Sequence, residues 1–151
     1  MKNIVFIILT LFFFQSVYAQ SISITGQWNY TIPTTDITEA GKDFSGTYTS
    51  SVNQVFLDIN HPHIWKISVK INNIDWDDNL RVYVRRTGNG WGSGRISGTQ
   101  NYKQTNNKGS TLINGNNLRY DVPLQYQIRN VSVTIPAHNY IAEIVYTLSA
   151  N

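Results

Sequence analysis

A short acidic segment holds the densest group of side chains that can ligate a metal ion. Asp75, Asp77 and Asp78 surround Trp76 and are followed by Asn79. Carboxylate and amide oxygens are the ligands that calcium prefers in proteins. The segment lacks the glycine and the distal glutamate of a helix-loop-helix calcium loop. We therefore predict a solvated turn here, with calcium binding by Asp75, Asp77 and Asp78 as the alternative.

A tryptophan lies in the most glycine-rich part of the chain. Trp91 stands between Gly90 and Gly92, with Asn89 just before them and Tyr102 further on. A tryptophan in a polar loop has few neighbours to bury it and can offer a flat apolar face to a sugar ring or a protein. One hypothesis is thus a ligand-binding site formed by Trp91, Tyr102 and Asn89. The alternative, which we favour, is that the indole folds back over an edge of the domain, because tryptophan is usually largely buried.

Residues suited to catalysis or to transition-metal binding are sparse. Glu39 and Glu143 are the only glutamates, and no serine has the sequence surroundings of a hydrolase nucleophile. His61 and His63 are separated by a proline that directs their imidazoles apart, and a zinc site needs further converging ligands. The chain has no cysteine. We therefore predict that the protein is not an enzyme and carries no cofactor.

The beginning of the chain has the pattern of a cleavable signal peptide. Lys2 precedes an almost uninterrupted apolar run over residues 4–14, and a small-x-small triplet follows at residues 17–19. The run is shorter than the roughly 20 apolar residues that span a bilayer, and the triplet marks a cleavage site. We predict a signal peptide at residues 1–19 and a single secreted domain at residues 20–151, located in the periplasm, at the cell surface or outside the cell. No integral membrane segment is expected after cleavage; the alternative is an uncleaved anchor or a buried first strand.

The mature chain is close to neutral. Loss of Lys2 with the signal peptide reduces twelve basic residues to eleven against nine acidic ones, so the net charge falls from +3 to +2. Arg81, Arg85 and Arg86 form the only local basic cluster, and we interpret them as the solvated face of a strand. Nucleic-acid binding requires a larger basic surface, so no nucleic-acid partner is predicted.

Strict alternation of apolar and polar residues dominates the mature chain. Successive residues of a strand point to opposite faces, so this period predicts half-buried strands. Residues 139–149 carry five apolar residues on one face and Ile141 and Val145 on the other, which predicts a central strand covered on both sides. The other predicted strands are residues 22–32 in one or two edge strands, 52–59, 65–72, 80–85, 122–128 and 131–135.

The turn residues between these strands indicate the fold. No window has a convincing helical period, and residues 106–109 are interpreted as a hairpin connection. Short strands separated by turn residues predict an all-β fold, namely a two-sheet antiparallel β-sandwich of immunoglobulin-like type. A small β-barrel is the alternative.

The end of the chain carries a resemblance to a known family. It reads Val122-Pro-Leu-Gln-Tyr-Gln-Ile-Arg-Asn-Val-Ser-Val-Thr-Ile-Pro-Ala-His-Asn-Tyr140, followed by Ile-Ala-Glu-Ile-Val-Tyr-Thr-Leu148. This segment resembles the C-terminal half of secreted bacterial pilin-like β-sandwich subunits of the spore-coat-protein-U kind, in which a Pro-Ala-x-x-Tyr corner leads into a long final strand. The family usually has glycine at the position of His138 and often carries cysteines, which are absent here. The resemblance implies an immunoglobulin-like sandwich that is exported and assembles by strand exchange.

The first residues of the mature chain are a second pointer to strand exchange. Residues 21–25 form a short alternating segment with apolar anchors at Ile22 and Ile24. Such a segment can add to the sheet edge of its own domain or of a neighbour through main-chain hydrogen bonds. An ordinary first strand of a self-contained sandwich is the alternative that we favour.

Two functions follow from these features. We expect a non-enzymatic structural or adhesive subunit that acts by protein–protein contact at the cell envelope, with itself or with envelope proteins as partners. The alternative is a carbohydrate- or ligand-binding module that takes a glycan on its exposed aromatic loop.

Overall fold

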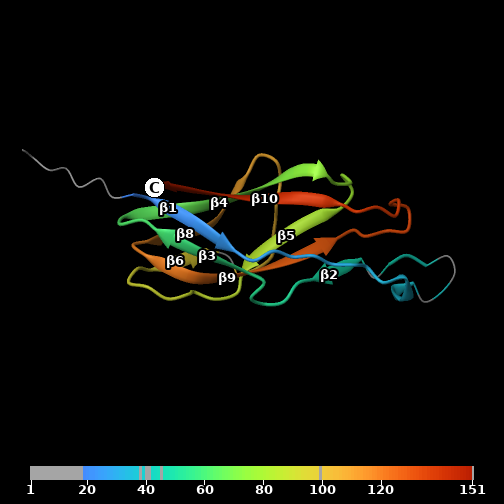
Figure 1. Ribbon diagram of the computed structural model, residues 1–151, viewed down its shortest axis with the longest axis horizontal. Helices are drawn as coiled ribbons and strands as arrows, with labels where there is room; N and C mark the ends of the chain where they lie inside the picture. The colour runs from blue at the N-terminus through green and yellow to red at the C-terminus, as the bar shows by residue number, and fades with distance from the viewer. Residues whose placement is uncertain (1–18, 38, 40–41, 45, 99, 151) are drawn as a thin grey trace, which may run out of the picture.

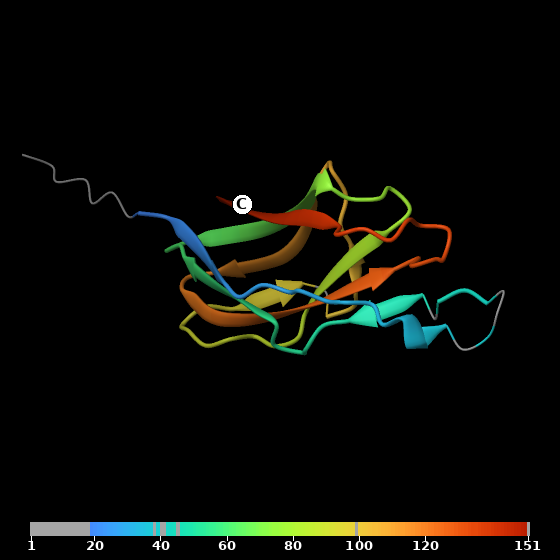
Figure 2. The ribbon, with the colours of Figure 1, turned by 45° about the vertical axis from the view of Figure 1, so that its right-hand side comes forward.

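The computed structural model describes residues 19–37, 39, 42–44, 46–98 and 100–150. These residues form two antiparallel sheets that pack against each other (Figures 1 and 2), which confirms the predicted β-sandwich. The two sheets do not close into the small barrel that was the alternative. The predicted signal peptide lies outside the described residues, apart from Ala19. In the described part of the chain, no helix has the length and apolar character needed to cross a membrane.

The first sheet has the strand order β1-β3-β9-β5-β7, and β2 also pairs with β9. The second sheet has the order β10-β4-β8-β6. The strands of the first sheet are β1 (Ser21–Thr25), β2 (Thr47–Thr49), β3 (Val55–Asn60), β5 (Arg81–Arg86), β7 (Lys103–Gln104) and β9 (Arg119–Arg129). Those of the second are β4 (Ile64–Asp75), β6 (Ile96–Gly98), β8 (Ser110–Asn116) and β10 (Ile141–Ala150), and a short 3-10 helix, η1 (Thr34–Asp36), precedes β2.

The main core lies between the sheets, where the alternation of the sequence predicts it. Trp65 and Ile67 of β4 are fully buried and belong to one cluster with Val122 and Leu124 of β9. The indole N–H of Trp65 donates to the carbonyl oxygen of Asn117 (2.8 Å), so the polar atom of this buried side chain is satisfied.

A second, smaller core explains why one strand prediction is wrong. Residues 131–135 form a turn rather than a strand. Val131 packs with Tyr48 and Leu80 in this core, and the carboxylate of Asp43 accepts the backbone N–H of Val133 (2.8 Å). The side chain of Asp43 therefore takes the place of a neighbouring strand as hydrogen-bond partner. The apolar residues of this segment pack in the smaller core from a turn rather than from a strand.

The final strand is an edge strand, so the prediction of a central strand covered on both sides is wrong. β10 pairs with β4 along its length and with no other strand of the described chain. Three of its inward residues, Ala142, Ile144 and Leu148, are only half-buried, whereas Tyr146 between them is buried. Apolar residues on its two faces reflect an open core at this edge rather than two covering layers.

The chain crosses between the sheets after β7 instead of forming the predicted hairpin. β7 pairs with β5 in the first sheet, whereas β8 pairs with β4 and β6 in the second. Thr105 is buried, and both its N–H and its hydroxyl donate to the carbonyl oxygen of Val82 (2.9 and 3.0 Å). This anchor keeps β7 on the first sheet. The turn that follows is closed by the side-chain oxygen of Asn106, which accepts the N–H of Lys108 (3.0 Å).

Candidate functional site

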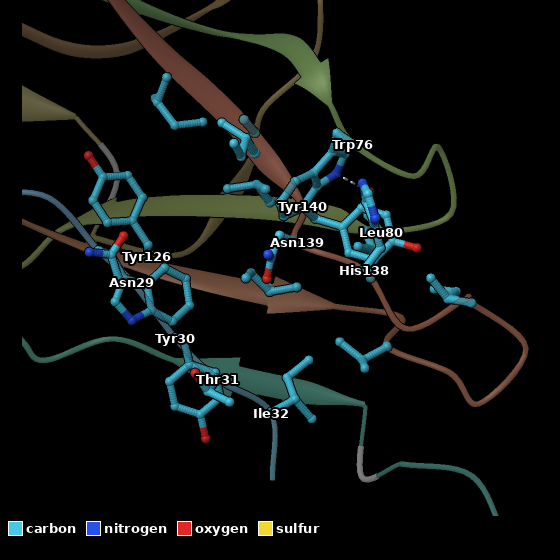
Figure 3. Close-up of a pocket in the computed structure, with 18 of the residues that line it drawn as sticks. Asn29, Tyr30, Thr31, Ile32, Trp76, Leu80, Tyr126, His138, Asn139 and Tyr140 are labelled. Carbon is cyan, nitrogen blue, oxygen red and sulfur yellow. Dashed lines mark hydrogen bonds between the residues drawn. The ribbon is translucent and has the colours of Figure 1, made fainter. Parts of the chain in front are cut away.

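A large groove opens along one side of the sandwich. It encloses about 1010 Å³ and is lined mainly by apolar side chains. Residues 27–32, which follow β1, form one wall, and residues 136–146, which lead into and through the first part of β10, form the other (Figure 3). β1 and the end of β10 lie at the same end of the molecule (Figures 1 and 2).

The groove is open because both sheets end there. β1 is the outermost strand of the first sheet and pairs only with β3, while β10 is the outermost strand of the second. None of the described strands joins these two edges. Of the eight exposed large hydrophobic residues in the described chain, four line the groove: Ile24, Tyr30, Val133 and Ile141, which are 46, 47, 51 and 54 % exposed.

An aromatic ladder forms part of the groove. Trp28 stacks on Tyr126 with ring centroids 6.4 Å apart and contacts Tyr30 at 5.9 Å. The hydroxyl of Tyr126 on β9 shares a hydrogen bond with that of Tyr146 on β10 (2.7 Å), so this pair joins the two sheets. Burial raises the pKa of Tyr126 to about 12 and that of Tyr146 well above its ordinary value. Both hydroxyls therefore stay protonated at neutral pH.

Polar groups gather at one end of the groove. Nε2 of His138 lies 2.7 Å from a carboxylate oxygen of Asp75, and the imidazole packs edge-on against Tyr140 at 5.2 Å. The hydroxyl of Tyr140 donates to the carbonyl oxygen of Pro136 (2.7 Å). Among the described residues no serine or threonine hydroxyl hydrogen-bonds to His138, so the His138–Asp75 pair does not extend to a nucleophile as it does in a catalytic triad.

The three carboxylates that suggested calcium each have a different partner. Asp75 contacts His138, Asp77 accepts the backbone N–H of Asn79 (2.7 Å), and Asp78 accepts a hydrogen bond from the side chain of Asn73 (3.3 Å). In the described part of the chain, no group of three or more His, Cys, Asp or Glu side chains is arranged to hold a metal ion. The acidic segment therefore gives no basis for a metal site.

Trp91 is held in an exposed position. It is 60 % exposed, and its ring lies 4.5 Å from that of Tyr120. Its indole N–H donates to the carboxylate of Asp121 (2.7 Å), and its backbone exchanges two hydrogen bonds with Tyr120 (both 2.9 Å). The indole thus does not fold back as a buried lid, although its ring contact with Tyr120 and its hydrogen bond to Asp121 hold it in place.

The other two residues of the predicted ligand site lie in different clusters. Asn89 accepts a hydrogen bond from the guanidinium of Arg86, and Tyr102 packs against Arg85. Arg86 is 4 % exposed, so its interpretation as part of a solvated basic face is wrong; burial, followed by the nearby charge of Arg119, lowers its pKa. Successive residues of a strand point to opposite faces. Arg85 and Arg86 are neighbours in β5, so Arg86 faces the core because Arg85 faces outward.

The two residues predicted for strand exchange lie on β1, which is paired with its own domain. All five residues of β1 have partners in β3, from Ser21 opposite Asn60 to Thr25 opposite Phe56. Ile22 is half-buried against the main core, whereas Ile24 is exposed and lines the groove.

Sequence reasoning missed the groove. One signal was present: Trp28 and Tyr30 alternate with polar residues, which places them on one side of an extended segment. The same alternation occurs when such side chains pack in a closed core and when they line an open groove, so it did not indicate the groove.

Comparison with known proteins gives no relative. No protein-family model, no curated protein sequence and no solved structure matches the chain.

Proposed function

We propose that the protein is an exported, non-enzymatic structural or adhesive subunit that acts by protein–protein contact at the cell envelope. The observation that carries this proposal is the apolar groove of about 1010 Å³ between two strand edges. Unpaired strand edges and contiguous exposed apolar surface are both features that favour association with another chain. The partner that we assign to the groove is an extended segment of a second copy.

An extended segment would satisfy both features at once. Its main chain would form hydrogen bonds with the free edge of β10, and side chains at alternate positions would enter the groove. Ile144, half-buried in the isolated chain, and Ile141, 54 % exposed, would lose their contact with water. Burial of apolar surface contributes about 25 cal/mol per Å², so a few such side chains suffice for a specific contact.

The first strand is the segment of the second copy that we assign to this role. Four of the five residues of β1 are exposed, so main-chain hydrogen bonds rather than side-chain packing hold it to β3. The same hydrogen bonds can form at the edge of another sheet, with Ile22 and Ile24 as apolar anchors. This assignment agrees with the strand exchange that the resemblance to pilin-like subunits implies.

Sedimentation velocity of the exported protein over a range of concentrations tests the proposal. We expect concentration-dependent association that Ile141→Lys weakens by about tenfold or more, because it places a charge in the apolar contact. Ile64→Lys is the matched control, since Ile64 is 57 % exposed on β4 and does not line the groove. It should leave association unchanged.

Two outcomes would contradict the proposal. One is a monomer at every concentration. The other is an equal effect of Ile141→Lys and Ile64→Lys, which would place the contact outside the groove.

A second function, glycan binding at Trp91, is favoured by one specific observation. The indole is exposed yet immobilised by Tyr120 and Asp121. A rigid aromatic face beside a carboxylate suits a sugar ring, whose C–H groups stack on the indole while its hydroxyls donate to the carboxylate.

An array of neutral glycans tests this second function. We expect Trp91→Ala to abolish the signal, while Trp91→Phe keeps part of it because an aromatic face remains. Absence of binding to any glycan, or binding that survives Trp91→Ala, would remove the hypothesis.

A further inference from the structure

The outer surface of the first sheet carries a cluster of arginine and tyrosine side chains that the groove does not use. Arg81, Tyr83 and Arg85 alternate along β5 with inward residues and so share its outward face. Arg129 pairs directly opposite Arg81 on β9, and Tyr102 lies just before β7. We call Tyr83, Arg85, Tyr102 and Arg129 the arginine–tyrosine face.

Each guanidinium of this face is fixed from two sides. Arg85 stacks over the ring of Tyr102 at 4.6 Å, and its Nε donates to the side-chain oxygen of Gln125 (2.9 Å). Arg129 stacks over Tyr83 at 4.0 Å, and its Nε donates to Gln127 (2.6 Å). The two glutamines are buried, so they form a fixed base for the guanidinium groups.

The outer nitrogens of both guanidinium groups remain unused. In the described part of the chain, Arg85 and Arg129 donate to protein acceptors only through Nε. Nη1 and Nη2 of each side chain are therefore free to form the paired hydrogen bonds that arginine makes with carboxylate or sulfate.

Among the described residues, the positive charge of this face has no ion-pair partner. The ion pairs of the described chain are Lys42–Glu39 and His138–Asp75, and neither involves the face. Arg81 lies beside the face, directly opposite Arg129 on the next strand, and like charges in that position repel each other, although the Arg81 guanidinium also donates to the carbonyl oxygens of Asp78 and Leu80. Tyr83 hydrogen-bonds to the exposed Gln104 (3.3 Å), which supplies a neutral polar group beside the charges. An anion bound here would relieve this repulsion.

We propose that the arginine–tyrosine face binds an anionic glycan, a chain of sugar rings that bear carboxylate or sulfate groups. Its anionic groups would accept hydrogen bonds from Arg85 and Arg129, while its rings and hydroxyls would contact the tyrosines and Gln104. An acidic peptide fits less well, because peptides are fixed through a free strand edge or side-chain pockets, and β5 and β9 are both interior strands. Duplex DNA needs a larger basic footprint.

Affinity measurements on immobilised polymers test this proposal. The exported protein is passed over polygalacturonate, dextran sulfate, neutral dextran, poly-glutamate and duplex DNA at several salt concentrations. We expect binding to one of the two anionic glycans, which identifies carboxylate or sulfate as the anion recognised, and none to neutral dextran. Affinity should fall as salt rises, because the charged groups are near the surface.

Three variants locate the contact. Arg85→Gln with Arg129→Gln should lower affinity by about tenfold or more, because charge-assisted hydrogen bonds are lost. Lys66→Gln with Lys70→Gln is the matched control, since it removes the same charge from β4 of the other sheet, and affinity should change by less than about twofold. Arg85→Lys with Arg129→Lys keeps the charge but loses the planar fork, so it should also bind weakly. Circular dichroism of each variant confirms that it is folded.

Several results would overturn the proposal. These are an equal loss in the Gln variants of arginine and of lysine, full affinity in the Arg→Lys variant, and tighter binding to poly-glutamate or DNA than to either anionic glycan. Binding to no polymer would also overturn it. The arginine variants leave Ile141 and Trp91 in place, so failure here is distinct from failure of either function proposed above.

Discussion

The two tyrosines that join the sheets beside the groove are the residues whose chemistry depends most on burial. Tyr126 and Tyr146 are 6 and 7 % exposed, and each hydroxyl has the other as its partner. Loss of one hydroxyl leaves the other buried without a hydrogen bond, which costs about 1–3 kcal/mol. This pair therefore fixes the spacing of the sheets at the point where no strand closes the side.

The tyrosine pair predicts a loss of stability in alkali. The pKa of Tyr126 is about 12 in the folded protein, against 10.0 for an exposed tyrosine. The unfolded chain releases this proton first, so the stabilisation is fully present below about pH 10 and is lost as pH rises through about 12. We expect a loss on the order of 2–3 kcal/mol, measured by urea unfolding.

Phenylalanine variants separate this effect from general alkaline damage. The double variant Tyr126→Phe, Tyr146→Phe should lose less stability than the parent between pH 10 and pH 12. Tyr30→Phe changes an exposed tyrosine of the same groove and should behave like the parent. Parallel pH curves for the parent and the double variant would refute this account of the pair.

Gly115 allows β8 to lie close to Trp65. A Cβ atom at this position would lie 2.4 Å from Cη2 and Cζ2 of the indole. Gly115→Ala should therefore destabilise the protein by about 1–3 kcal/mol in urea unfolding, as overpacking does. The same change should cost less in a Trp65→Phe background, because the clashing ring is absent; an equal cost in both backgrounds would mean that the backbone, not the indole, is the obstacle.

Among the secondary-structure elements, the positions of the strands were easier to predict from the sequence than the elements with which each strand pairs. The alternation around Trp65 and Val122 located β4 and β9, since inward and outward residues differ strongly in polarity. It also predicted a strand at residues 131–135, where a hydrogen bond from Val133 to the distant Asp43 maintains a turn instead. That contact is long-range and leaves no local signal.

The open edge at β10 could not be predicted for a related reason. Residues 141–150 carry apolar side chains on both faces, and the same pattern suits an interior strand and an edge strand beside a groove. The residues predicted to form one ligand site also lie in different places, because Trp91 is held by Asp121 and Tyr102 packs against Arg85. Periodicity indicates which side of an element is apolar; it does not indicate which elements meet.

Deletion of the first strand tests whether β1 is the segment that is exchanged between copies. Deletion of residues 20–25 should abolish self-association and lower stability, because both the exchanged segment and its pairing with β3 are lost. A synthetic peptide of residues 20–32 should restore stability when added to the deletion variant, as measured by its unfolding midpoint. Unchanged association and unchanged stability after the deletion would exclude a role for Ile22 and Ile24 in exchange.

At the scale of the whole molecule, three surfaces with different chemistry are spread over a small sandwich. The groove is apolar and open to an extended chain, Trp91 presents a fixed aromatic face, and the arginine–tyrosine face is basic. The chain has no cysteine, so no disulfide contributes to the stability of the fold. Filling of the groove by a second copy would complete the packing of Ile141 and Ile144, so assembly and stability would increase together.

Hydrogen exchange at β10 tests the central claim most directly. Residue-specific amide exchange of residues 20–151 is compared at low and high protein concentration, with Ile141→Lys as the variant whose association is weakened. We predict that alternate amides of residues 141–150, those directed away from β4, become protected at high concentration in the parent and stay unprotected in the variant. Association that leaves these amides as fast to exchange as in the monomer would contradict the claim that a second copy adds a strand at this edge.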